Sequence, residues 1–142
     1  MREEYHSQIA VLHVAPVVVS ADVTPAAGVN MKEIEACKFV VSIGADGATL
    51  AGTDKIEFIL QESDDDSTYA AVTSADKVIG ATPSATGIVI TLDGTLAVEE
   101  SVVEVAYVGD KNFARLFSDV TGTVSIPVGI NALTGHLNRS RA

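Results

Sequence analysis

The chain has 142 residues, enough for one domain with its own core, and 47% of them are hydrophobic, which excludes a disordered acidic tail. There is no Trp, and β-branched Val and Ile favour pleated surfaces. The formal net charge of -10 argues against nucleic acid or an anionic membrane as the main partner. It suits the surface of a soluble particle or a basic protein partner.

Residues 1–16 are expected to form an arm ahead of the main domain. The first residues carry charges of both signs and lack the basic start and cleavage site of a signal peptide. This predicts synthesis in a cytoplasm without export. The apolar run at 9–19 is interrupted by His13 and Pro16 and is too short to span a bilayer.

Short apolar runs then alternate with clusters of Gly, Pro, Asp, Ser and Thr, a pattern typical of strands and turns. The clearest strand is 55–62, where Ile56, Phe58 and Leu60 lie on one face. In chain order, further strands are predicted at 17–23, 35–43, 69–72, 87–92, 101–108, 113–117 and 124–130, with a minor strand at 76–79. Helical periodicity is weak and limited to short turns at 31–38 and 96–100.

About eight short strands in one domain predict an all-β fold, a single-domain antiparallel β-sandwich resembling a jelly roll. The sandwich is expected to occupy residues 17–135. A polar, slightly basic tail, residues 136–142, follows it. Residues 109–112 have the composition of a tight hairpin loop.

The sharpest local feature is a run with four carboxylates in five positions. These are Glu62, Asp64, Asp65 and Asp66. They could bind calcium through hard oxygens, but the run lacks the glycine and the distal glutamate of an EF-hand loop. It also joins two predicted strands, where Asp and Ser cap turns through their own backbone. We therefore predict a structural turn, keep calcium as the alternative, and expect no cofactor.

The single cysteine and the histidines offer little chemistry. Cys37 lies in an apolar run and is predicted to be a small buried hydrophobe, since one cysteine forms neither an intramolecular disulfide nor a cysteine-rich zinc site. His6, His13 and His136 have no carboxylate or cysteine at a recognised ligand spacing, so no metal site is predicted. Arg115, inside an apolar strand, is expected to pair with an acidic neighbour or face solvent.

Motifs of catalysis and phosphate binding are absent from the sequence. It has no Gly-x-Ser-x-Gly elbow and no glycine-rich phosphate loop, and any Ser/His/Asp arrangement would be an arbitrary choice. An enzyme is therefore the least expected class, and no catalytic residue is predicted.

Three segments in order resemble a family of small phage and prophage particle proteins: KIEFILQESDD at 55–65, YVGDKNFARL at 107–116 and SDVTGTVSIP at 118–127. Residues 20–25 also fit, and the resemblance covers roughly residues 17–135. It departs after Ser63, where Asp-Asp-Asp-Ser stands in place of an expected Asp-Gly turn, and residues 1–16 look like an addition.

The resemblance implies a non-enzymatic virion structural protein. The first hypothesis is capsid decoration on the virion surface, as a homo-oligomer bound to the major capsid protein, after synthesis in the bacterial host cytoplasm. The second hypothesis is a tail or head–tail connector component. The third hypothesis is a carbohydrate-binding module. It is weaker because sugar platforms usually need exposed Trp or Tyr rings, and the chain has no Trp and only three tyrosines, Tyr5, Tyr69 and Tyr107.

The arm carries the candidate assembly residues. These large aliphatics are Ile9, Val11, Leu12 and Val14. An exposed apolar strand promotes aggregation unless it is paired or covered. The arm either folds back as an extra strand of its own sandwich or adds to a neighbouring subunit or the capsid. We favour the second solution, because a particle protein must hold partners through surfaces that its own core does not use.

Overall fold

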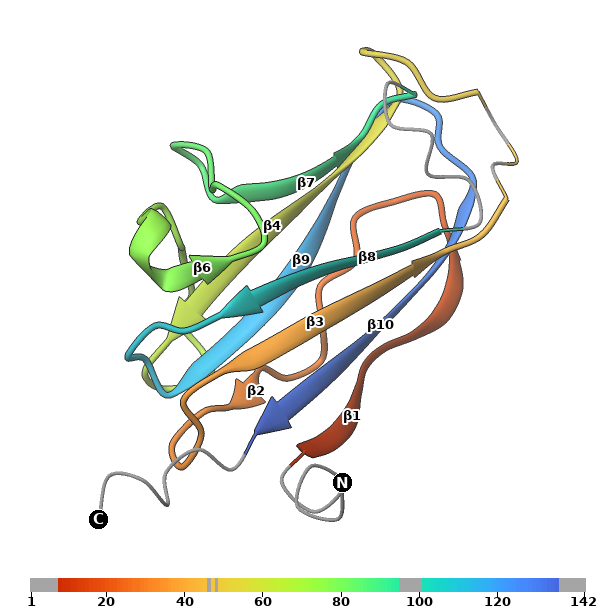
Figure 1. Cartoon of the computed structure of the whole chain (residues 1–142). Helices are drawn as coiled ribbons and strands as arrows, with labels where there is room; N and C mark the ends of the chain where they lie inside the picture. The colour runs from red at the N-terminus through yellow and green to blue at the C-terminus, as the bar shows by residue number, and fades with distance from the viewer. Residues whose placement is uncertain (1–7, 46, 48, 95–100, 136–142) are drawn as a thin grey trace.

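The computed structural model describes residues 8–45, 47, 49–94 and 101–135, and shows two antiparallel five-stranded sheets packed as a sandwich (Figure 1). Sheet A has the order β1-β10-β3-β8-β6, and sheet B has the order β2-β9-β4-β5 with β7 also paired to β4. The predicted all-β sandwich is confirmed, with ten strands in place of about eight. Among the described residues, no helix is long and apolar enough to cross a membrane.

The elements follow in chain order. They are β1 (Gln8–Val19), β2 (Val29–Asn30), β3 (Cys37–Ile43), β4 (Lys55–Ser63), β5 (Ala70–Ala71), the 3-10 turn η1 (Ala75–Lys77), β6 (Val78–Ile79), β7 (Ile88–Leu92), β8 (Ser101–Tyr107), β9 (Phe113–Thr121) and β10 (Ile126–Gly135).

The connectivity is that of a jelly roll with two short additions. Four antiparallel pairs are nested in the sequence: β1 with β10, β2 with β9, β3 with β8, and β4 with β7. Their members lie in the order β1-β10-β3-β8 in one sheet, while β2, β9, β4 and β7 lie in the other. Eight strands rolled up in this way form a jelly roll. The two-residue strands β5 and β6 are insertions between β4 and β7.

Alternating side chains from both sheets fill one core. On β4, Ile56, Phe58 and Leu60 are fully buried, as the period-2 pattern predicts. Tyr107 on β8 is also fully buried. Cys37 on β3 packs in the core, and burial raises the pKa of its thiol to about 12, so it behaves as the predicted small hydrophobe.

One of the two helical turns expected from the sequence falls within the described residues. The helical turn expected at 31–38 is one hydrogen-bonded turn, in which the Ile34 amide donates to the Met31 carbonyl at 3.2 Å. The strand β3 then begins because the β-branched side chains after Cys37 pair with β8 and β10. The turn expected at 96–100 lies outside the described residues.

The boundary expected between arm and domain, at residue 16, falls inside β1. This strand pairs with β10 from Gln8 to Val19, so the described part of the arm is an edge strand of its own sandwich (Figure 1). That is the first of the two solutions considered. The pairing has register shifts between Leu12 and Val14 and between Val14 and Val17, which break the alternation that would have marked one continuous strand.

Candidate functional site

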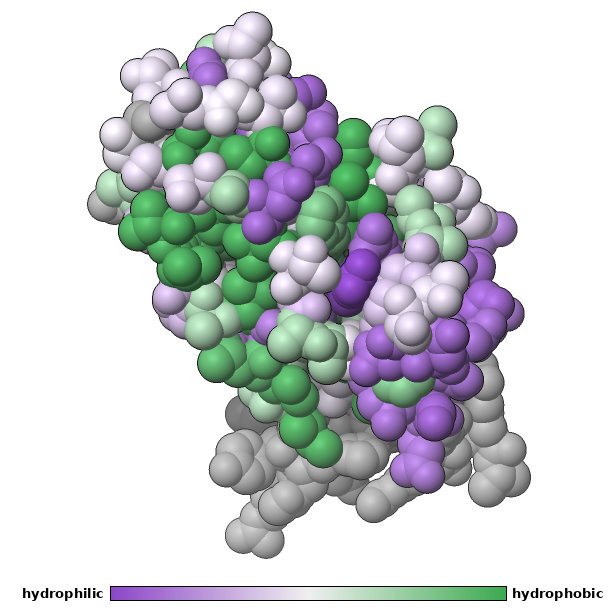
Figure 2. Space-filling view, turned by 180° about the vertical axis from the view of Figure 1, so that it is seen from behind, coloured by the Kyte–Doolittle hydropathy of each residue, from purple (hydrophilic) through white to green (hydrophobic). Residues whose placement is uncertain are grey.

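The exposed large aliphatic side chains of the described residues all belong to sheet A. Five lie on β1, one on β6 and one on β8. They are Ile9, Val11, Leu12, Val17, Val18, Ile79 and Val102, and between 42% and 61% of each is exposed. Single exposed aliphatics are ordinary, but a set confined to one sheet indicates an interaction surface. Figure 2, seen from behind the view of Figure 1, shows hydrophobic residues gathered along one margin of that face and hydrophilic residues along the other.

The register divides the exposed side chains of β1 between two directions. Leu12 lies opposite Asn131, which faces outward, so Leu12 belongs to the outer face of sheet A. Val11 lies opposite the buried Ala132, so Val11 points to the core side yet remains exposed at the sheet edge. Ile9 and Val17 also lie opposite buried β10 residues.

The four candidate assembly residues therefore separate into two groups. Val14 lies opposite Ile130 and is buried, so it is a core residue. Ile9, Val11 and Leu12 are exposed and remain available for contact with another molecule.

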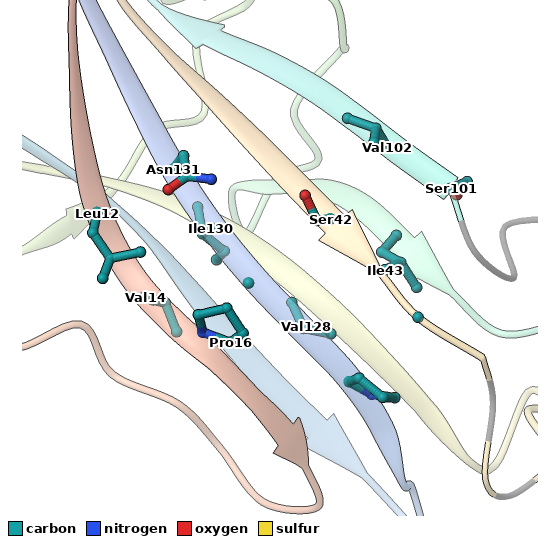
Figure 3. A pocket seen from close by; sticks show the side chains of 13 residues that line it. Leu12, Val14, Pro16, Ser42, Ile43, Ser101, Val102, Val128, Ile130 and Asn131 are labelled. Carbon is teal, nitrogen blue, oxygen red and sulfur yellow. The ribbon is translucent and has the colours of Figure 1, made fainter.

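A shallow groove of about 430 Å³ crosses the outer face of sheet A (Figure 3). Leu12 and Pro16 on β1 form one side, Val102 on β8 lies on the other, and β10 and β3 form the floor between them. Gly129 in the floor allows the close approach of Pro16, since a Cβ at this position would come within 3.2 Å of the proline Cγ. None of the 13 residues that line the groove carries a charge.

Sheet A is nearly free of charge as a whole. Its five strands contain only Lys38 and Glu104 as Asp, Glu, Lys or Arg residues, and these two form an ion pair of 3.3 Å. The strands β4 and β9 of sheet B, in contrast, carry three carboxylates and two cationic side chains. The charges that produce the net -10 therefore lie mostly outside the surface that exposes the aliphatic side chains.

The acidic run after β4 forms a turn held by its own side chains. The Asp65 carboxylate accepts hydrogen bonds from the Thr68 amide at 2.8 Å, the Ser63 hydroxyl at 2.9 Å and the Ser67 amide at 3.0 Å. These donors, with the Thr68 amide first, lower the pKa of Asp65. Asp65 therefore caps the turn in the way predicted from the sequence.

Asp66 lies in the Asp-Asp-Asp-Ser run that follows Ser63. Its backbone is left-handed, with φ of 57°, a conformation that Asp tolerates better than most residues. Its carboxylate accepts from the Gly28 amide at 2.8 Å and from the Tyr69 hydroxyl, which ties the turn to the segment before β2.

The other two carboxylates point to different partners. Glu62 accepts from the Tyr107 hydroxyl at 2.6 Å and from Lys77 at 2.8 Å, while Asp64 pairs with Lys111 at 2.8 Å. The four carboxylates of the calcium hypothesis thus do not converge on one point. No group of three or more His, Cys, Asp or Glu side chains in the described part of the chain is placed to hold a metal ion.

His13 has a structural contact that the sequence analysis missed. Its Nε2 atom accepts a hydrogen bond from the Leu116 amide at 3.1 Å, and its ring centroid lies 5.0 Å from that of Phe39. Burial, with a smaller effect of the Arg115 charge, lowers the pKa of His13 to about 4. A neutral His13 therefore links β1 to β9 across the sandwich.

The only feature of the sequence that pointed to this contact was a lone histidine within an apolar run. His6 and His136 lie outside the described residues.

The two described tyrosines do not form a sugar platform. Tyr107 is fully buried, and the Arg115 guanidinium lies 3.8 Å from the ring centroid of Tyr69. Arg115 also donates to Gln61 at 2.7 Å, so it binds an amide in place of the expected acidic neighbour. Tyr5 lies outside the described residues.

Comparison with known proteins adds no assignment. No protein-family model matches the sequence, and a search of curated proteins finds no match.

Proposed function

We propose that the protein is a non-enzymatic structural component of a phage-type particle, and that it decorates and stabilises the capsid shell. It binds the major capsid protein through the outer face of sheet A, after synthesis in the bacterial host cytoplasm. The observation that carries the proposal is the uncharged groove on the outer face of sheet A, flanked by Leu12 and Val102, each of which is 61% exposed.

The surface of sheet A has the chemistry of a protein-binding face. The cores of protein interfaces are depleted in charged residues and well packed, while their rims are polar. The groove between Leu12 and Val102 supplies an uncharged centre, and the Lys38–Glu104 ion pair lies beside it on the same sheet. A complementary apolar ridge on a capsid subunit would fill the groove.

The charge of the remaining surface fits a molecule exposed on a particle. With sheet A against the shell, sheet B and the acidic turn after β4 face solvent. A net charge of -10 then keeps decorated particles apart through mutual repulsion.

The fold alone does not choose between hypotheses, because jelly rolls form viral capsid domains and lectins alike. The tyrosine arrangement favours the structural hypothesis over sugar binding. Tyr107 is in the core and Tyr69 is covered on one ring face by Arg115.

Co-sedimentation tests the proposal. The purified chain is mixed with empty shells of the major capsid protein, and separately with purified tails, and bound protein is measured after centrifugation. We expect binding to shells, and Val102→Asp is expected to weaken it about tenfold or more, because it places a charge in the apolar face. Val102 is 61% exposed, so the variant is expected to fold.

Thr73→Asp is the matched control, since it adds the same charge at an exposed position outside sheet A. It is expected to bind shells as the wild type does. Binding to tails but not to shells would favour the connector hypothesis, and binding to neither would overturn the proposal. Equal binding by Val102→Asp and wild type would overturn the assignment to sheet A.

A further inference from the structure

We propose that β1 is a dimerisation strand. Two copies of the chain pair their β1 strands antiparallel across a two-fold axis, so that two A sheets join into one continuous sheet. This inference concerns the edge of sheet A and does not depend on capsid binding through its outer face.

The open edge of β1 requires a strand as its partner. β1 is the terminal strand of sheet A, with β10 on one side and no described strand on the other. It is 12 residues long, whereas β2, β5 and β6 have two residues each and β7 has five. Unpaired amides and carbonyls along such an edge are a template for strand addition, because only another backbone satisfies them in register.

Because β1 carries no charged residue, we expect its partner strand to be uncharged as well. Proteins protect long edges with charged side chains, prolines and bulges. β1 contains no Asp, Glu, Lys or Arg, and its only protection is Pro16 and the two register shifts nearby. Its N-terminal half, Gln8 to Leu12, pairs with β10 without a shift and remains a regular, unprotected edge.

A second copy of the chain meets this requirement. Two molecules of net charge -10 repel each other, and the repulsion is weakest where the facing strands carry no charge. Neither β1 nor the adjacent β10 contains a charged residue. An antiparallel strand pair about a two-fold axis also needs only one kind of surface, because each copy presents the same edge to the other.

The register of the regular half predicts the position of the axis. With the axis at Ala10, Ile9 of one copy lies opposite the partner's Val11. Both side chains point to the core side of sheet A and are 48% and 42% exposed in the single chain. Pairing would cover both and so close the open margin of each core.

Charged substitutions on the two sides of the two-fold axis, made in the full chain, test the inference. Sedimentation equilibrium of the wild type is expected to show a monomer–dimer equilibrium. Ile9→Glu and Val11→Lys each place like charges near the axis and are expected to raise the dissociation constant about tenfold or more. The double variant Ile9→Glu/Val11→Lys sets each glutamate opposite the partner's lysine, and is expected to restore most of the dimer.

Two further variants keep the result interpretable. Thr73→Glu, at an exposed position outside sheet A, is the matched control and is expected to dimerise as the wild type does. Ala10→Cys is expected to cross-link two chains with a short bis-maleimide, since the two Ala10 positions face each other while Cys37 is buried. A wild type that is monomeric at all concentrations, or single variants that dimerise as the wild type does, would overturn the inference. Unfolded single variants would leave the cross-link as the decisive result, and its absence would also overturn it.

Discussion

At the scale of single residues, two polar side chains make specific contacts within the fold. His13 lies in an apolar strand and accepts the Leu116 amide, while Asp65 caps the turn that follows β4. The three aspartates that follow β4 could be recognised from sequence as part of a turn, because Asp and Ser at such positions bind their own backbone. The His13 contact could not be recognised, because it joins strands that are 103 residues apart.

His13 predicts a loss of stability in mild acid. The folded state holds its pKa near 4, below the ordinary 6.5, so the unfolded state takes up the proton first as the pH falls. The stabilising contribution is complete above pH 6.5 and is lost as the pH falls to 4. Denaturant titrations are expected to show a decrease of about 2–3 kcal/mol in the free energy of unfolding across this window.

His13→Gln provides the comparison for that measurement. Other titrating groups contribute equally to both proteins, so the difference between wild type and variant isolates the histidine. The variant is expected to lack this part of the pH dependence. A wild type and a variant with parallel pH profiles would contradict the prediction.

Asp65 predicts a stability effect without calcium. Asp65→Asn is expected to lower the thermal midpoint more than Asp64→Asn, because Asp65 accepts three hydrogen bonds within the turn whereas Asp64 forms an exposed ion pair. Thermal unfolding with and without calcium checks this prediction. A midpoint that rises with calcium in the wild type and no longer does so in Asp64→Asn would favour the calcium alternative.

At the scale of elements, the strands that sequence predicted well are those with uninterrupted alternation. β4 is the clearest case, since Ile56, Phe58 and Leu60 all enter the core. β1 was assigned partly to an arm, because Pro16 and two register shifts break its pattern. A strand of two residues, such as β2, is too short to show an alternation of buried and exposed side chains, so only its pairing with a neighbouring strand defines it. The groove was not predictable, because its sides come from strands far apart in the sequence.

Deleting residues 1–15 is expected to destabilise the domain. The deletion removes Val14 from the core and breaks the His13 contact with β9, and it uncovers the edge of β10. Removing a buried valine alone costs about 1–3 kcal/mol by lost burial and the cavity left behind. Circular dichroism during heating is expected to show a much lower midpoint than in the full chain.

A deletion limited to residues 1–7 is the control, since it leaves every described strand whole. It is expected to melt close to the full chain. If the protein without residues 1–15 melts at the same temperature as the full chain, β1 contributes little to the stability of its own sandwich.

At the scale of the whole molecule, charge and apolar surface are separated. Sheet A exposes aliphatics, while most of the charge that gives the net -10 lies elsewhere. The overall acidic charge was evident from composition. Its distribution was not, because composition does not say which face of which strand carries a residue.

This separation predicts that salt strengthens dimerisation. Two acidic molecules repel over distances that salt screens, whereas the contact between uncharged β1 strands is not weakened by screening. The dissociation constant of the dimer is expected to fall as the ionic strength rises from 0.05 M to about 0.5 M, where the Debye length is a few ångströms. Sedimentation at several salt concentrations measures it, and a dimer that dissociates in salt would indicate an interface built on ion pairs instead.

The nested strand order also has a consequence for synthesis. β1 leaves the ribosome before every other described strand, and its partner β10 leaves last. At ordinary translation rates, on the order of ten seconds pass between the synthesis of β1 and the synthesis of β10. During that time it is an unsatisfied apolar edge on every nascent chain, open to neighbouring chains on the same messenger RNA. A circular permutant that joins β10 directly to β1 makes their contact local, so it is expected to fold faster and to aggregate less during expression.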